Sequence, residues 1–81
     1  MLSVVMKMKY ERIKALREDH DYKQQDLADY LHLTRSAYSN YENGIRDVPL
    51  EVLSALADFY HTSVDYLLGR TEDARPFRPK G

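Results

Sequence analysis

The residues best suited to chemistry are short polar side chains on one predicted helix face. They are Arg35, Ser36, Ser39, Asn40 and Asn43. Their spacing of i, i+1, i+4, i+5 and i+8 places them on one side of a helix. Ser and Asn are poor helix formers, so this face gives up helix propensity for uncharged donors and acceptors. Base edges in the DNA major groove are read by such groups, with Arg suited to guanine and Asn to adenine. We predict that the first four residues of the set read bases; the alternative is an ordinary solvated face.

Two short helices joined by a tight turn are expected to position this face. The first runs from about Gln24 to Leu31, and its apolar residues fall on one side. The second starts at Thr34, whose hydroxyl makes it a good N-cap. It ends at Gly44, which can adopt the left-handed cap conformation without a Cβ clash. The three-residue connection between the two helices is the length of a helix-turn-helix.

This stretch resembles the lambda-repressor/Cro-like helix-turn-helix family, also called the XRE family. The matching residues are Gln24, Leu27, Ala28, Thr34, Tyr38, Glu42, Asn43 and Gly44, with Ile13, Leu16 and Arg17 before them and Pro49 to Glu51, Leu53, Leu56, Ala57 and Ser63 to Gly69 after them. The resemblance covers about Tyr10 to Gly69 and implies an all-α, five-helix DNA-binding domain. The sequence departs from the family at His32, where a turn Gly is usual, and at Lys23, where a Ser or Thr cap is usual. If position 32 requires a positive φ, His32 is strained.

The resemblance also implies roles for residues around the two helices. It implies an ion pair between Arg17 and Glu42, tying the first helix to the end of the reading helix; the alternative is two exposed charges worth little. Helix N-termini favour phosphate, and polar residues flank the two helix starts. The predicted phosphate-binding residues are Lys23, Gln24, Thr34, Asn43 and Arg46.

The rest of the chain supplies three further helices and two ends. The first helix is expected from about Lys9 to His20, the fourth from Pro49 to Tyr60, and a short fifth between the Ser63 cap and Gly69. Residues 1–8 form an N-terminal extension or an alternative start region. Residues 9–69 form the DNA-binding domain. Residues 70–81 have no apolar period and are predicted to be a mobile tail.

The fourth helix is apolar on most sides. Its polar residues form one narrow stripe, so a partner chain is expected to cover part of the remainder. The predicted dimer contacts are Val52, Leu56, Phe59, Tyr66 and Leu67. The competing account is that the fifth helix and the N-terminal segment cover this helix within one chain.

Composition limits the function further. The 81 residues make one domain with a net charge of −1, and the acidic excess lies in residues 47–70, away from the reading helix. The absence of Cys fits a reducing cytoplasm, and no apolar run is long enough to span a membrane. The three His residues lack metal-ligand spacing, and no nucleophile–base arrangement or phosphate-binding Gly loop is present. The sequence therefore predicts no enzyme, no metal and no cofactor.

Together these features predict a homodimeric, cytoplasmic regulator of transcription that binds double-stranded DNA at a palindromic operator. Repression by blocking RNA polymerase is the expected mechanism, and no small-molecule ligand or membrane partner is evident. Two other classes stay open. One is a protein-interaction module, of the antitoxin or antirepressor type, on the same fold. The other is a DNA-binding subunit whose effector is a separate chain.

Overall fold

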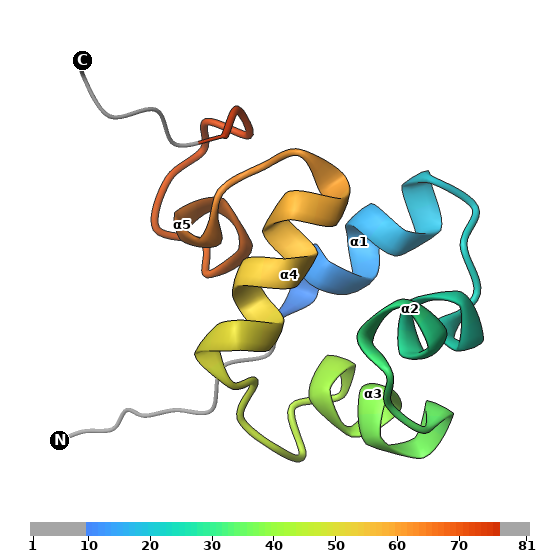
Figure 1. The fold of residues 1–81 in the computed structure, drawn as a ribbon. Coiled ribbons are helices and arrows are strands. Elements are labelled where there is room, and N and C mark those ends of the chain that lie inside the picture. The colour runs from blue at the N-terminus through green and yellow to red at the C-terminus, as the bar shows by residue number, and fades with distance from the viewer. Residues whose placement is uncertain (1–9, 77–81) are drawn as a thin grey trace, which may run out of the picture.

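The computed structural model describes residues 10–76, which form five α-helices. They are α1 (Glu11–Asp19), α2 (Gln24–Leu31), α3 (Arg35–Glu42), α4 (Leu50–Tyr60) and α5 (Val64–Leu67). Helices α2 and α3 pack against each other, α4 crosses the middle of the domain, and α5 lies on the side away from α3 (Figure 1). No strand occurs within the described residues. The predicted all-α, five-helix class is therefore confirmed.

The hydrophobic core joins all five helices. Its buried residues are Ile13, Leu27, Ala28, Tyr38, Val48, Leu53, Leu56, Ala57, Tyr60 and Leu67. The helical periodicity of the sequence places most of them correctly, because residues spaced by three or four share a helix face. Burial of this apolar surface is the main favourable term that holds the short helices in place.

The predicted helix boundaries agree with the structure to within one or two residues. Thr34 caps α3 by accepting a hydrogen bond from the Ala37 N–H at 3.1 Å, and Ser63 caps α5 in the same way from Tyr66 at 3.0 Å. Pro49 is a correction, because its extended backbone (ψ 152°) makes it the N-cap of α4 rather than its first helical residue. Helix α1 begins at Glu11; the predicted start at Lys9 and residues 1–8 lie outside the described residues.

Each of the five helices ends with the same backbone arrangement. A residue with left-handed φ follows the helix, and two hydrogen bonds close it, as at α3, where Gly44 donates to the Tyr41 carbonyl and Ile45 to the Asn40 carbonyl. The left-handed residues at these five helix ends are Asp21, His32, Gly44, His61 and Gly69. Three of the five carry a Cβ, so each of those three adopts a conformation that costs an L-residue roughly 1–2 kcal/mol.

His32 gives this cost a direct test, because φ of 59° places it in the left-handed region within the turn between α2 and α3. We expect His32→Gly to raise the free energy of unfolding by about 0.5–1 kcal/mol, since the relief of strain exceeds the added entropy of a Gly in the unfolded chain. Urea unfolding measures this change in the free energy of unfolding. His20→Gly is the matched control, because His20 has an ordinary φ of −95° and should gain nothing. Equal midpoints for His32→Gly and the unaltered chain would contradict the strain.

The first part of the predicted mobile tail, residues 70–76, differs from the prediction, and residues 77–81 lie outside the described residues. Over residues 70–76 the chain lies against the domain and is held by specific contacts. Arg12 on α1 donates to the backbone carbonyls of Tyr66 and Thr71, and its guanidinium lies 4.2 Å from the centre of the Tyr66 ring. Thr62 donates from its hydroxyl to the Ala74 carbonyl. Polar contacts of this kind leave no hydrophobic period in a sequence, which is why periodicity could not predict them.

Candidate nucleic-acid interface

The reading face predicted on α3 lies at the surface of the domain. Arg35 and Ser36 are exposed, and Ser39 and Asn40 are half-buried on the same side. Tyr38 lies on the opposite side and is fully buried, so it fixes the rotation of the helix. Asn43 follows as the C-cap and donates from its side chain to the Ser39 hydroxyl at 3.2 Å. The structure therefore brings the predicted base-reading residues together on one accessible surface.

The single acidic residue of α3 is turned away from that surface. Glu42 is 5% exposed. Its carboxylate accepts hydrogen bonds from Arg17 Nε at 2.7 Å and from Arg17 Nη2 at 3.1 Å. Arg17 thus forms the ion pair that the family resemblance implies. The Tyr38 hydroxyl donates to the same carboxylate at 2.6 Å, and the Gln24 side-chain nitrogen donates at 3.2 Å. This network joins α1, α2 and α3 and leaves no carboxylate on the outer face of α3.

The network also sets the ionisation of its members. Burial acts to raise the pKa of Glu42, but the hydrogen bonds from Arg17, Tyr38 and Gln24 outweigh burial, so the pKa of Glu42 lies below its ordinary value. Burial, the hydrogen bond to Glu42 and the Glu42 charge all raise the pKa of Tyr38. Burial, followed by the Glu42 charge, raises the pKa of Tyr60, whose hydroxyl has no hydrogen-bond partner among residues 10–76. The carboxylate is therefore ionised and the phenols are neutral near pH 7.

The predicted phosphate-binding residues fall at the two ends of α3. The hydrogen bond from Gln24 to Glu42 places the start of α2 beside the C-terminal end of α3, near Asn43, while Thr34 lies at the opposite end. Eight helical residues span about 12 Å, which is close to the ~12 Å width of the major groove. The two ends of α3 are thus separated by a distance that suits the two DNA strands bordering one groove.

The two helix starts differ in how well they suit an anion. No acidic residue occupies the first turn of α3, and Thr34 caps it. Helix α2 carries Asp26 in its first turn, where the carboxylate accepts the Lys23 N–H at 2.8 Å. The side chain of Gln24 donates to Glu42, which leaves the helix N-terminus as the part of Gln24 that the predicted phosphate contact uses.

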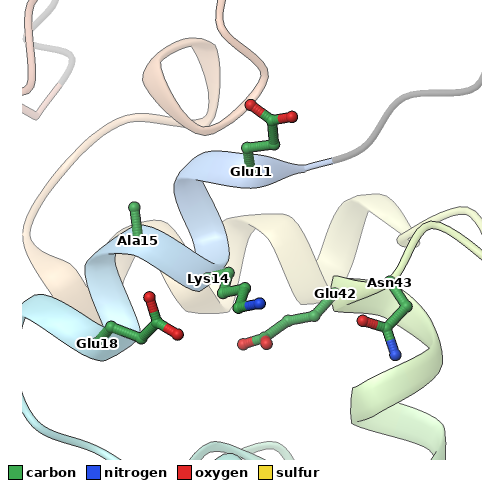
Figure 2. A pocket seen from close by; sticks show the side chains of 6 residues that line it. All are labelled: Glu11, Lys14, Ala15, Glu18, Glu42 and Asn43. Carbon is green, nitrogen blue, oxygen red and sulfur yellow. The ribbon is translucent and has the colours of Figure 1, made fainter.

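A hollow of about 480 Å³ lies between α1 and the end of α3, and Figure 2 shows its lining. The residues around it are Glu11, Lys14, Ala15, Glu18, Glu42 and Asn43. Glu18, Lys14 and Glu42 face the same space (Figure 2). The Glu42 carboxylate is already paired with Arg17, and the two remaining carboxylates, Glu11 and Glu18, outnumber the Lys14 ammonium, which disfavours a phosphate in the hollow. Asn43 is the one residue of this lining that belongs to the predicted DNA contacts.

Two predicted dimer contacts are wrong. Leu56 is 1% exposed and Leu67 is 2% exposed, because α4 and α5 bury them in the core of the same chain. The other three candidates, Val52, Phe59 and Tyr66, are half-buried. Folding within one chain therefore covers part of the apolar face of α4, as the competing account expects of the fifth helix; the N-terminal segment that this account also invokes lies outside the described residues. The predicted polar stripe of α4 consists of Glu51, Ser54 and Asp58 and continues to His61, and all four residues are exposed.

Sequence reasoning missed two exposed apolar residues. Ile45 is 69% exposed and Leu50 is 71% exposed, on either side of the buried Val48. The sequence carries a signal for the exposure of Leu50. It precedes Ser54 and Asp58 by four and eight residues, so it lies on the same helix face as the polar stripe of α4. Ile45 lies in the loop between α3 and α4, where no helical periodicity applies.

Comparison with known proteins agrees with this geometry. A family model described as helix-turn-helix matches residues 13–67. The chain therefore belongs to this helix-turn-helix family, and the predicted resemblance to XRE-type regulators is confirmed. No helix within residues 10–76 has the length and apolar character needed to cross a membrane.

Several curated relatives come from Bacillus subtilis. The chain is 38% identical over 66 residues to the uncharacterized HTH-type transcriptional regulator YobD, covering 82% of this chain and 59% of the relative. It is 41% identical over 63 residues to the HTH-type transcriptional regulator AnsR, and the match covers 78% of this chain and 54% of the relative. It is 37% identical over 62 residues to the HTH-type transcriptional regulator ImmR, and the match covers 76% of this chain and 49% of the relative. The chain thus spans about half the length of these relatives, and no solved structure matches it significantly.

Proposed function

We propose that the chain binds duplex DNA at specific sequences and regulates transcription, with α3 in the major groove. The observation that carries this proposal is the charge of α3. Its one carboxylate, Glu42, is buried against Arg17, so its outer face offers Arg, Ser and Asn groups with no negative charge. Such a face suits an anionic duplex and its base edges. The names of the relatives as transcriptional regulators support the same conclusion.

Two copies on inverted half-sites complete the proposal. Recognition helices related by a two-fold axis lie about 34 Å apart on one side of the duplex, and they read a palindromic operator. Protein bound there excludes RNA polymerase, which makes repression the expected outcome.

Selection of bound duplexes from a random DNA pool tests this function directly. We expect the purified chain to enrich one short motif. If no sequence is enriched over the starting pool, site-specific DNA binding is ruled out. A tight complex with a protein partner in place of DNA would then favour the interaction-module alternative.

The phosphate contacts are tested by salt dependence. We expect Lys23→Ala and Arg46→Ala to weaken binding to all sequences alike, and each to reduce the slope of log K against log salt by about one. The reason is that each cation releases about one counterion from DNA when it meets a phosphate. Arg70→Ala is the control, because Arg70 lies beyond α5 near Asp65 and should leave the slope unchanged. Unchanged slopes in both test variants would remove these residues from the DNA contact.

A further inference from the structure

A large apolar side chain is exposed directly after the reading helix. Ile45 is 69% exposed, although isoleucine is among the residue types most often buried in proteins. It follows Gly44, whose left-handed φ of 76° turns the chain away from the axis of α3. Packing in the core therefore gives no reason for an isoleucine at this position.

The backbone holds Ile45 against the C-terminal end of α3. Its N–H donates to the Asn40 carbonyl at 2.9 Å, and the N–H of Arg46 donates to the same oxygen at 3.3 Å. Asn40 is one of the predicted base-reading residues. Helix α3 and the loop that follows it lie together at the lower edge of the domain in Figure 1. Ile45 is therefore fixed relative to the reading helix and reaches the duplex together with it.

The neighbours of Ile45 in the chain place it next to DNA in the proposed complex. Asn43 and Arg46, on either side of it, are exposed and are the predicted phosphate contacts at this end of α3. A side chain between two phosphate contacts is covered by the duplex when the complex forms. Covering an isoleucine is most favourable where it meets an apolar group of the DNA.

Thymine offers such an apolar group in the major groove. Besides hydrogen-bonding groups, the base pairs present the C5 methyl of thymine there. This methyl lies on the side of the base next to its own sugar–phosphate strand, so a residue beside a phosphate contact is well placed to reach it. The predicted base readers of α3 are all polar, and Ile45 adds a different kind of contact to the same surface.

We propose that Ile45 reads the C5 methyl group of a thymine at the edge of the major groove and so adds a thymine preference to the site that α3 reads. This inference rests on the proposed function. Burying one methyl group against an aliphatic side chain changes affinity about three- to fivefold. A contact between Ile45 and deoxyribose would carry no sequence information, so the two kinds of contact are separable by experiment.

The test uses the motif selected from random DNA and replaces its thymines one at a time by deoxyuridine, which lacks only the C5 methyl. We expect one replacement in each half-site to lower the affinity of the unaltered chain about three- to fivefold. Ile45→Ala should show the same loss on the thymine duplex and no further loss on the deoxyuridine duplex. This non-additivity assigns the methyl contact to Ile45.

A second pair of duplexes adds the methyl group to a different base. With cytosine in place of that thymine, 5-methylcytosine should raise the affinity of the unaltered chain over unmodified cytosine by about three- to fivefold. Ile45→Ala should not distinguish the two duplexes.

Leu50→Ala is the matched control, because Leu50 is 71% exposed and lies on α4. It should keep the full ratio of affinities between the thymine and deoxyuridine duplexes. Ile45→Ala should leave folding intact because Ile45 is exposed, and a urea midpoint equal to that of the unaltered chain checks this.

The outcomes separate this inference from the proposed function. A selected motif without thymine overturns the inference alone, and so does an equal thymine-to-deoxyuridine ratio in Ile45→Ala and in the unaltered chain. A uniform loss for Ile45→Ala on every duplex, with or without the methyl, overturns it in favour of a deoxyribose contact. Failure to select any motif overturns the proposed function and the inference with it.

Discussion

Replacing Glu42 by Ala is expected to lower the free energy of unfolding by about 3–5 kcal/mol, a large part of the stability of so small a domain. The variant leaves the Arg17 guanidinium largely buried without its carboxylate, since the Arg17 side chain is only 12% exposed. It also removes the acceptor for the buried Tyr38 hydroxyl and for Gln24. Urea unfolding at neutral pH measures the loss.

Glu51→Ala is the matched control, because Glu51 is exposed on α4 and should change stability by no more than about 0.5 kcal/mol. Similar midpoints for the two variants would mean that the Glu42 network contributes nothing. The pH dependence gives a second measurement. Because the folded-state pKa of Glu42 lies below the ordinary value of 4.5, its contribution is present above pH 4.5 and is lost as the pH falls through the lower folded-state pKa. The chain with Glu42→Ala should lack this part of the acid transition.

Truncating Arg35 or Asn40 to Ala is expected to cost about 1–3 kcal/mol of binding free energy at the preferred DNA site and to relax the preference at one base position. Both residues lie on the outer face of α3, away from the core residue Tyr38. Their removal should therefore leave folding intact. Affinity for the selected motif and for single-base variants of it, measured at one salt concentration, provides the comparison.

Arg70→Ala controls for the loss of one positive charge outside the proposed reading face. A base-reading role predicts that Arg35→Ala changes the selected sequence, whereas a phosphate role predicts a uniform loss over all sequences. Wild-type affinity and an unchanged sequence preference in both Arg35→Ala and Asn40→Ala would show that α3 does not read the bases.

The sequence predicted the helices well because their signals are local. Periodicity gave the apolar faces, and Thr34 and Ser63 gave two helix starts through their hydroxyl groups. Family resemblance supplied the Arg17–Glu42 pair, but not the two further donors to the same carboxylate. Periodicity places Tyr38 in the core without indicating where its hydroxyl goes, since that depends on how α1 and α2 meet α3.

The errors concern contacts between segments far apart in sequence. The apolar excess of α4 indicated a partner chain, yet α5 folds back and covers much of that surface, which buries Leu56 and Leu67. The segment after Arg70 looked unstructured, yet Arg12 holds it from a position about sixty residues earlier. Neither contact follows from helical period or from capping residues, because both depend on the tertiary arrangement.

The shared geometry of the helix ends has a practical consequence for protein engineering. Asp21, His32 and His61 close three different helices, so the gains from replacing them by Gly should be nearly additive. A chain with all three replacements would carry a stability reserve of about 1.5–3 kcal/mol. Substitutions on α3 that are too destabilising to purify in the natural chain would stay folded in that background. The contribution of each α3 side chain to DNA recognition could then be measured separately from its contribution to folding.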